Sequence, residues 1–281
     1  MSDRLAYPPR TRSTPGSEFV ASMLKVGPGD EHDRRVLAEA EAGNVPEFLS
    51  QLVTVEYRET VAGVEYAVRV QTAPDYFAIG TDDDYVRWPV GGDVAQRIAD
   101  MIGAELPTPK LVTRIWIASK HLEPSPLSPG ADMMSTAYFA RHHAAIESQR
   151  VSTPWVDGEL IGGVKKDIVR AHTLPRSYPG NVAIFGWHRA SGTPIQNLNP
   201  NGQELTHERR YRDYSHGARF LSQWVEIDAG DEHFGGDLGE MLTLPELTWL
   251  VNDAVVDGKP YPYAWRYPTP SLTQFAARDQ T

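Results

Sequence analysis

Residues 52–72 read LVTVEYRETVAGVEYAVRVQT and alternate apolar with polar side chains on either side of Val61-Ala62-Gly63. Because successive side chains of a β-strand point to opposite faces, this alternation predicts two strands that each bury one face. A short segment that contains glycine between two such strands is typical of a tight hairpin turn. The stretch therefore predicts a β-hairpin within an antiparallel or mixed sheet.

Helical patterns lie on both sides of this hairpin. Residues 30–42 and 92–102 carry apolar side chains at helical spacing, and helices are predicted there and over 17–25 and 132–150. A further helix is predicted to begin after Thr108, because a threonine hydroxyl suits an N-cap and the following Pro109 suits the first helical position.

The C-terminal half is predicted to consist of strands and long loops. VKKDIVRA (164–171), NVAIFGW (181–187) and ARFLSQWVEI (218–227) have the composition of strands, and turns rich in Asn, Gly and Pro separate them. Thr243-Leu244-Pro245-Glu246 matches a capping box, which predicts a last short helix that ends near Asn252.

This order of elements is neither a strict βαβ alternation nor all-β. The predicted fold class is therefore α+β, with N-terminal helices, an antiparallel or mixed β-sheet, central helices and a loop-rich C-terminal β half. Residues 1–15, rich in Pro, Arg and Ser, are expected to form a disordered or loosely draped arm. Residues 16–281 are expected to form a single globular domain, with a subdivision near 123–131 as an open alternative.

Charge and composition argue against several classes of function. The 281 residues carry a formal net charge of −10, so no overall basic field attracts nucleic acid or an anionic membrane, and neither partner is expected. The chain has no cysteine, which excludes disulfides, thiol nucleophiles and Cys-ligated metals. The sequence has no apolar run near the roughly 20 residues of a membrane span and no signal-peptide core at its N-terminus. A cytoplasmic protein is expected, unless the sequence is that of a mature secreted form; its oligomeric state stays open.

The histidines are unevenly placed along the chain. Five of the nine lie within 62 residues of one another, at His172, His188, His207, His216 and His233. Imidazole titrates near neutral pH and is the commonest metal ligand in proteins, so this crowding points to acid–base or metal chemistry. The alternative is that several of them cap loops or stack on aromatic rings.

Residues 211–219, YRDYSHGAR, form the densest group of chemically active side chains. Asp213 and His216 are spaced for a tight turn, in which the carboxylate could accept a hydrogen bond from the imidazole and raise its basicity. Ser215 adjoins His216 in sequence, so the two side chains diverge and a Ser–His pair is not expected. The alternative is a polar turn ahead of the strand at 218–227.

Two further segments carry candidate side chains. Trp187-His188 ends a predicted strand, a place where ligands often bind. In Lys165-Lys166 adjacent side chains point to opposite faces, so at most one, assigned here as Lys166, faces a pocket and binds an anionic group. The alternatives are a core tryptophan and two solvated lysines.

No metal site or cofactor is predicted. The sequence lacks His-Glu-x-x-His, EF-hand and P-loop spacings, and His142-His143 diverge by about 100° on a helix, so they do not chelate one ion as an i,i+4 pair does. A divalent metal held by histidines brought together in space is left as an alternative.

Several of these segments also resemble known sequences. The runs PEFLSQLVTV, AQRIADMIGAELPTPKLVTRIW, LIGGVKKDIV, VAIFGWHR with GTPIQNL, and YRDYSHGARF are similar to a group of bacterial proteins of unassigned function, over roughly residues 16–258. The resemblance implies no particular activity. It implies that the chain is one unit, and it directs attention to Trp187-His188 and to Asp213-Tyr214-Ser215-His216.

Together these patterns favour a hydrolase-like enzyme that acts on a polar oligomer, namely a peptide, a peptidoglycan fragment or a glycan. His216 is predicted to be the general acid/base, oriented by Asp213, with His188 as a second acid/base or ligand. Lys166 and Arg219 are predicted to hold an anionic group.

Two alternatives from other classes stay open. One is a non-catalytic sugar- or peptide-binding protein that stacks its ligand on Trp187, Tyr211 and Tyr214. The other is a structural domain whose polar residues tie loops together. The enzyme hypothesis expects residues 187–188 and 211–219 to lie around one pocket, and expects His216 to be partly exposed.

Overall fold

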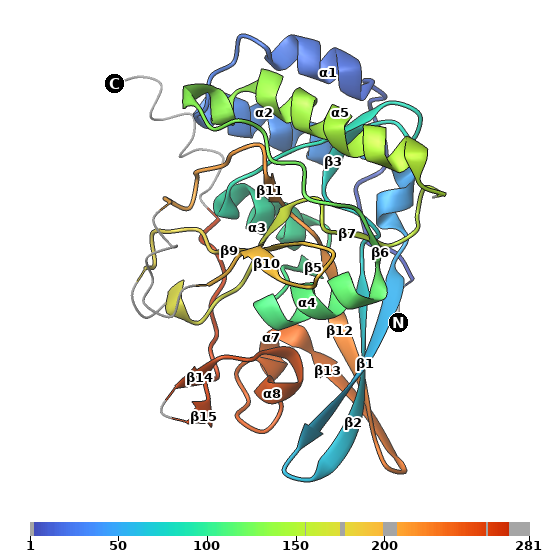
Figure 1. Ribbon diagram of the computed structural model, residues 1–281, viewed down its shortest axis with the longest axis vertical. Coiled ribbons are helices and arrows are strands. Elements are labelled where there is room, and N and C mark those ends of the chain that lie inside the picture. The colour runs from blue at the N-terminus through green and yellow to red at the C-terminus, as the bar shows by residue number, and fades with distance from the viewer. Residues whose placement is uncertain (1–2, 155, 175–177, 199–206, 257, 270–281) are drawn as a thin grey trace.

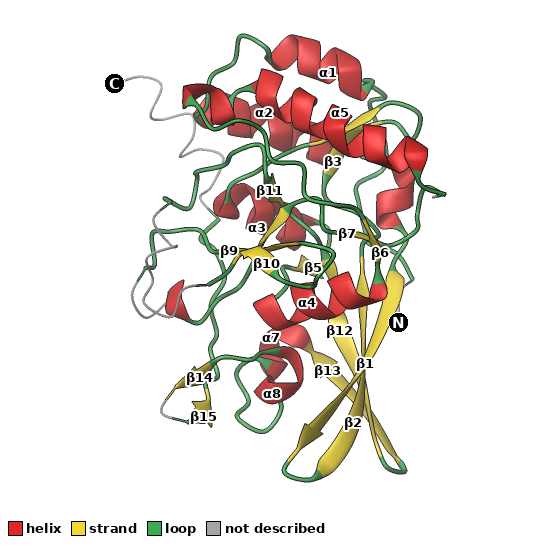
Figure 2. Cartoon of the chain, in the orientation of Figure 1, coloured by secondary structure: helices red, strands yellow, loops and turns green. Residues whose placement is uncertain are grey.

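The computed structural model describes residues 3–154, 156–174, 178–198, 207–256 and 258–269. Most of the helices gather at one end of the molecule, and the largest β-sheet lies at the other end (Figure 1). The helices do not alternate with the strands of the large sheet (Figure 2), so the predicted α+β class is confirmed.

The hairpin predicted from residues 52–72 is present. Strand β1 (Val53–Val61) pairs antiparallel with β2 (Val64–Thr72), in a register that ends with Val61 opposite Val64. The two residues of the turn, Ala62 and Gly63, both have left-handed backbone, with φ of 50° and 83°. Two consecutive positive φ values define the type I′ turn whose twist suits a two-residue hairpin.

This hairpin supplies two of the five strands of the large sheet, whose main path has the order β1-β2-β12-β13. The C-terminal half supplies β12 (Leu221–Ala229) and β13 (Glu232–Asp237), and the short β5 (Ala104–Glu105) pairs with the start of β12. All of these pairings are antiparallel. The apolar face of the sheet packs on helix α4 (Pro109–Ala118) through Leu111 and Ile115.

Helix α4 begins as predicted. The Thr108 hydroxyl accepts a hydrogen bond from the backbone N–H of Leu111 at 3.2 Å, and Pro109 occupies the first helical position. The same hydroxyl donates to the Val251 carbonyl at 2.5 Å, which joins this helix start to the C-terminal part of the chain.

A second, smaller sheet has the order β10-β9-β8-β11 and carries half of the predicted site residues, namely Lys166, Trp187, His188 and His216. Its strands are β8 (Lys166–Ile168), β9 (Ile184–His188), β10 (Pro194–Gln196) and β11 (His216–Gly217). Strands β8 and β9 are antiparallel, whereas β11 is parallel to β8. Two-residue strands β6 (Lys120–His121) and β7 (Ile161–Gly162) pair nearby, in parallel.

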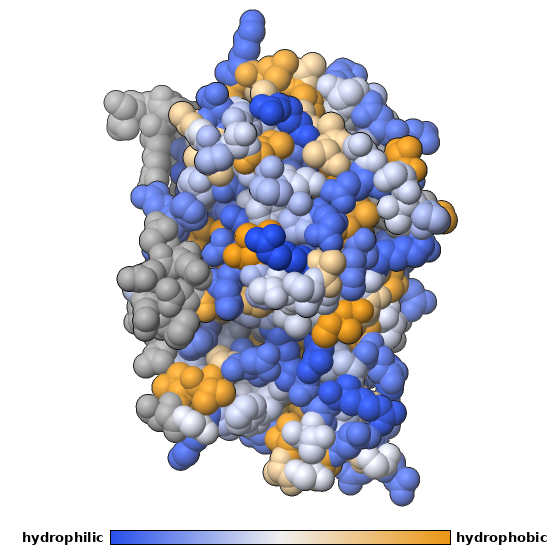
Figure 3. Space-filling model, viewed as in Figure 1, coloured by the Kyte–Doolittle hydropathy of each residue, from blue (hydrophilic) through white to orange (hydrophobic). Residues whose placement is uncertain are grey.

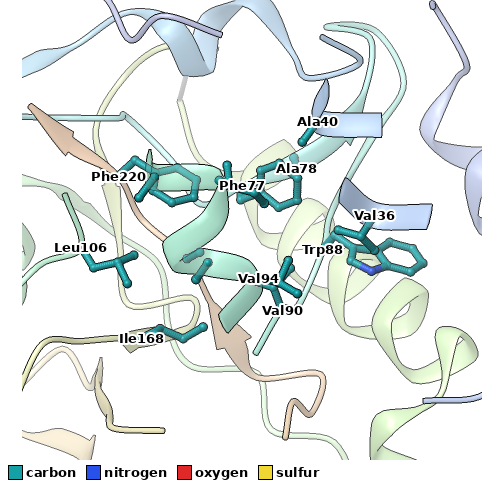
Figure 4. Packing of buried hydrophobic residues seen from close by; sticks show 14 of the residues in the cluster. Val36, Ala40, Phe77, Ala78, Trp88, Val90, Val94, Leu106, Ile168 and Phe220 are labelled. Carbon is teal, nitrogen blue, oxygen red and sulfur yellow. The ribbon is translucent and has the colours of Figure 1, made fainter. Parts of the chain in front are cut away.

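The helical end consists of α1 (Gly16–Met23), α2 (Asp30–Glu41), α3 (Gly92–Met101) and α5 (Thr136–Ser152). The 3₁₀ turns η1 (Glu47–Ser50) and η2 (Ala131–Met134) and the hairpin of β3 (Ala78–Gly80) and β4 (Tyr85–Arg87) complete it. Its core packs Trp88, Phe77 and Val94 against residues of α2 and against Phe220 (Figure 4). The largest core of the molecule therefore joins the helices to the chain around the small sheet.

The predicted capping box near the C-terminus is not formed. The Thr243 hydroxyl donates back to the Glu240 carbonyl at 2.7 Å, next to the short helix α7 (Leu238–Met241). The next helix, α8 (Thr248–Val251), begins later and has no side-chain cap. Strands β14 (Val255–Val256) and β15 (Lys259–Pro260) follow as a small hairpin.

The expectation of a disordered or loosely draped arm is wrong for residues 3–15. The backbone N–H of Leu5 donates to the Ser50 carbonyl at 2.8 Å and that of Thr11 donates to the Ala42 carbonyl at 2.8 Å. Leu5 itself is buried in the main core. A polar composition does not prevent order here, because Leu5, Tyr7 and several backbone hydrogen bonds tie the segment to its neighbours.

The face in Figure 3 is mostly hydrophilic, with apolar residues in small separate patches. Within the described part of the chain, no helix is both long enough and apolar enough to cross a bilayer.

Candidate functional site

The small sheet brings the two predicted segments together. Lys166 of β8 lies opposite His216 of β11 on one side and opposite Gly186 of β9 on the other. As a result the rings of Trp187 and Tyr214 lie 6.4 Å apart, centroid to centroid. At these two aromatic residues the two segments therefore come within side-chain reach of each other.

His188 lies in a different environment from its neighbour Trp187. Its ring stacks on Trp116 at 5.1 Å and contacts Phe185 at 5.8 Å. Gly186 and Trp187 both have positive φ, 98° and 56°, which is uncommon for a residue as bulky as tryptophan and interrupts the regular alternation of β9. The prediction of one pocket around residues 187–188 and 211–219 holds only in part: Arg219 lines a small void together with Trp187 and His188, whereas Tyr211 and Arg212 line a separate cleft.

The predicted hydrogen bond between Asp213 and His216 is not formed. The Asp213 carboxylate accepts instead from the backbone N–H of Ser215 at 2.7 Å and from the Ser215 hydroxyl at 2.5 Å. The turn itself is present, because the backbone N–H of His216 donates to the Asp213 carbonyl at 3.1 Å. Ser215 is closer in sequence to Asp213 and takes the carboxylate that His216 was expected to use.

His216 is fully buried, which differs from the expected partial exposure. Neither ring nitrogen has a hydrogen-bond partner among the described residues. Burial lowers the pKa of His216 to about 4, although the nearby Asp213 carboxylate acts in the opposite direction. The imidazole is thus neutral at pH 7, with two polar atoms unused, and buried groups of this kind are enriched at functional sites.

A cleft of about 420 Å³ lies beside this imidazole. It opens between the start of α2 and the segment ahead of β11, and its lining consists of Pro28, Gly29, Met134, His207, Glu208, Arg210, Tyr211 and Arg212. His207 stacks face to face on Tyr211 at 3.8 Å. The His216 ring lies 5.6 Å from Tyr211 and 6.4 Å from His207, so these two side chains separate it from the cleft.

The cleft also contains an ion-pair cluster. Arg210 bonds to Asp30 and Asp33 at the start of α2, the latter at 3.0 Å. Arg212 pairs with the other oxygen of Asp33, also at 3.0 Å. Two cations thus face two carboxylates beneath the cleft.

The two lysines of β8 have different surroundings. Lys166 is half-buried, and its ammonium lies 5.4 Å from the Trp187 ring centroid. Lys165 is buried and donates to the Tyr214 carbonyl at 2.6 Å. Burial lowers the pKa of Lys165 to about 7. Lys165 therefore supports the 211–216 turn. Lys166, the less buried of the two, is the lysine that could still bind an anionic group as predicted.

Arg219 is a structural residue rather than the predicted anion holder. It donates to the backbone carbonyls of Ala73 at 2.9 Å and Ile161 at 2.7 Å, and it stacks on Tyr76 at 4.3 Å. Its carboxylate neighbour Asp167 accepts from the Tyr76 hydroxyl at 2.8 Å. We refer to the space whose lining includes Tyr76, Trp116, Asp167, Trp187, His188 and Arg219 as the Asp167 void; at about 10 Å³ it has room for roughly one water molecule.

The aromatic residues predicted to stack a ligand are mostly internal. Trp187 and Tyr214 are only 4% and 3% exposed, and the Tyr214 hydroxyl is bonded to the backbone of Leu127. His142 of α5 fills the space between them, 4.9 Å from Tyr214 and 6.0 Å from Trp187. Of the three aromatic residues, Tyr211 alone lines the cleft.

Sequence reasoning gave no role to Arg210 and Arg212, and counted His207 only as one member of a loose histidine group. The segment HERRYR at 207–212 did carry a signal, because it places an imidazole, a phenol and three guanidiniums within six residues. Its partner, the Pro28–Gly29 corner, is about 180 residues away in sequence and gave none.

In the described residues, no three His, Asp or Glu side chains lie close enough together to hold a metal ion. Comparisons with family models, with curated proteins and with solved structures find no match for this chain. The resemblance to a bacterial group therefore stays a prediction, and the function has to be argued from the cleft itself.

Proposed function

We propose that this protein is a hydrolase-like enzyme that binds a polar oligomer, a peptide, a peptidoglycan fragment or a glycan, in the cleft at residues 207–212. The observation that carries the proposal is that a titratable side chain lines a cleft large enough for a ligand. His207 and Tyr211 line a cleft of about 420 Å³, and the unpartnered imidazole of His216 lies directly behind them.

In this proposal His207 takes the substrate-facing role that the sequence assigned to His216, because His216 has no exposed surface. Burial lowers the pKa of His207 below its ordinary value, while Asp213 partly opposes the shift. A neutral His207 is able to take a proton from water as the water oxygen bonds to the electrophilic carbon of the substrate. The same imidazolium then returns the proton to the leaving group as the scissile bond breaks.

The neighbours of His207 have supporting roles. Burial raises the pKa of Tyr211, so its phenol stays protonated and available as a hydrogen-bond donor to negative charge that develops on the substrate. Asp213 and Lys166 act on the two imidazoles electrostatically, with opposite signs. His216 then serves as a positioning residue behind the cleft wall.

A screen for turnover tests this proposal. Wild-type protein is incubated with peptides, muropeptides and oligosaccharides, and the products are identified by mass spectrometry. We expect turnover on one of the three classes and a loss of about 10²- to 10⁴-fold in kcat for His207→Gln, since general acid–base catalysis contributes that much. His233→Gln is the matched control, because His233 is exposed on the large sheet and pairs with Asp228.

The non-catalytic binding protein remains the second candidate, and the ionic lining of the cleft favours it. Two arginines there suit recognition of an anionic group whether or not chemistry follows. Binding of an oligomer to the cleft without turnover on any class would support this candidate and overturn the hydrolase.

A further inference from the structure

Arg212 uses only one side of its guanidinium. Its Nη1 donates to the Arg210 carbonyl at 3.1 Å and pairs with Asp33 at 3.0 Å. Its Nε and Nη2 have no hydrogen-bond partner among the described residues, although the side chain is only 2% exposed. A buried charged donor without a partner is costly, because it has lost its water and gained nothing in exchange.

The two unused donors lie on the same edge of the guanidinium. The Nε–H and Nη2–H bonds of arginine are parallel, and together they match the two oxygens of a planar oxyanion. The opposite case is Arg87, whose Nε and Nη2 both donate to Asp75, at 2.9 and 2.6 Å. At Arg212 the corresponding carboxylate is missing from the described residues.

A second feature of the cleft favours negative charge in the same place. Gly29 lines the cleft and is the N-cap of α2, a helix of 12 residues that has no side-chain cap. Helix N-termini present free backbone N–H groups and a partial positive charge to an anion. Arg212 and the start of α2 therefore meet at one cleft, where the carboxylates of Asp30 and Asp33 in the first helical turn pair with the arginines.

We propose that this cleft binds the carboxylate of its ligand, with the oxygens on Nε and Nη2 of Arg212. This inference rests on the proposed function in taking the cleft as the substrate site, and it names the substrate class: an oligomer that carries a carboxylate. A monoanion fits better than a phosphate dianion, because Asp30 and Asp33 already place two negative charges beside the arginines.

Access to the two nitrogens requires a small rearrangement. Both are buried, so a side chain of the cleft wall changes rotamer when the carboxylate enters. Met134 lines the same cleft, and methionine has three rotatable bonds and readily adapts its shape. The carboxylate anchors the oligomer at Arg212, and the adjoining part of the ligand then lies toward His207 and Tyr211.

Calorimetric titration of the full chain with matched acids and neutral analogues tests the inference without depending on turnover. The probes are N-acetyl-trialanine and its C-terminal amide, and an N-acetylglucosamine–glucuronic acid disaccharide and its methyl ester. We expect one acid to bind about 10- to 100-fold more tightly than its neutral analogue, as a charge-assisted pair provides. Which acid does so distinguishes a peptide carboxylate from a sugar acid.

Variants locate the effect. Arg212→Lys keeps the charge but loses the paired donors, and is expected to abolish the preference for the acid. Arg209→Lys is the matched control, since it makes the same substitution at an arginine that pairs with Asp93 outside the cleft lining, and is expected to keep that preference. The wild-type comparison of acid with neutral analogue holds even if an Arg212 variant fails to fold.

The outcomes separate this inference from the proposed function. Equal binding of acid and neutral analogue, no binding of either acid at millimolar concentration, or an unchanged preference in Arg212→Lys overturns the carboxylate site. Inorganic phosphate that displaces the acid at lower concentration than acetate does so overturns the choice of a monoanion. Binding of an acid without turnover supports the carboxylate site and overturns the hydrolase proposal. Turnover without a preference for the acid supports the hydrolase proposal and overturns the carboxylate site.

Discussion

Two groups of polar side chains lie around the small sheet. Each contains a histidine and an arginine, but the groups differ in the volume of the cavity beside them and in the hydrogen bonds of the arginine. The Asp167 void holds His188 and Arg219, and the cleft holds His207 and Arg212. Burial lowers the pKa of His188 to about 4, the same value as for His216 behind the cleft. Shifted pKa values therefore do not distinguish the two regions.

Space distinguishes them, and so do the hydrogen bonds of their two arginines, although Asp167 Oδ1, Trp116 Nε1 and Trp187 Nε1 at the void also lack a hydrogen-bond partner among the described residues. The void has about 10 Å³ and the cleft about 420 Å³. Arg219 donates to two backbone carbonyls, whereas Arg212 leaves two donors unused. A buried polar group that is fully bonded stabilises the fold, and one that is unbonded beside an open cleft is available to a ligand.

Replacement of the two buried arginines gives the largest expected difference. Arg219→Ala leaves the buried carbonyls of Ala73 and Ile161 without their donor and removes the cation that opposes the burial-raised pKa of Asp167, and it should lower the free energy of unfolding by about 3–5 kcal/mol. Arg212→Ala should cost only about 1–2 kcal/mol, because Asp33 keeps Arg210 and two unbonded donors are removed. Urea titrations of both variants measure this; losses of equal size would mean that both arginines are structural.

The two buried imidazoles should respond to pH in the same way. Each has a folded-state pKa of about 4, below the 6.5 of an unfolded histidine, so the unfolded state binds more protons between these values. Stability therefore rises as the pH rises from about 4 to 6.5, and each histidine contributes about 2–3 kcal/mol to that rise.

His188→Gln and His216→Gln should each flatten this rise, because glutamine does not titrate. Chemical unfolding at a series of pH values from 4 to 7 provides the measurement, with the exposed His233→Gln as the control. A variant whose stability changes with pH as steeply as that of the wild type would show that its histidine is not buried in the neutral form.

A smaller loss of stability is expected when only the helix that supports the Asp167 void is weakened. Thr108 caps α4, the helix that supplies Trp116 to the Asp167 void. Thr108→Ala should lower the free energy of unfolding by about 1–2 kcal/mol, through the loss of the cap and of the bond to Val251. Turnover and ligand binding at the cleft should be unchanged, and a matching loss of activity would argue that the void side is the working side.

Local patterns in the sequence predicted the local structure well. The alternation over 52–72 gave the hairpin, and Thr108-Pro109 gave the start of α4, because both depend on residues that are close in sequence. The capping box at Thr243 failed because that hydroxyl has a competing acceptor three residues earlier, at Glu240. Side-chain hydrogen bonds of this kind are decided by small differences in backbone geometry.

The site was predicted less completely, for a physical reason. The sequence predicted the turn from Asp213 to His216 correctly. It did not predict which side chain bonds to the Asp213 carboxylate, because the Ser215 hydroxyl competes with the His216 imidazole for it. The approach of Trp187 to Tyr214 follows from the order of strands β9, β8 and β11. The cleft forms where the Pro28–Gly29 corner meets residues 207–212. These segments are far apart in sequence, and a local sequence pattern does not predict a contact between them.

The central claim is that the cleft, and not the Asp167 void, is the working site. The most direct test is to compare kcat/KM of His207→Gln and His188→Gln on the substrate class that the wild type turns over. We predict a loss of about 10²- to 10⁴-fold for His207→Gln and a change of less than about threefold for His188→Gln. A large loss for His188→Gln with normal turnover by His207→Gln would contradict the account and place the site at the void.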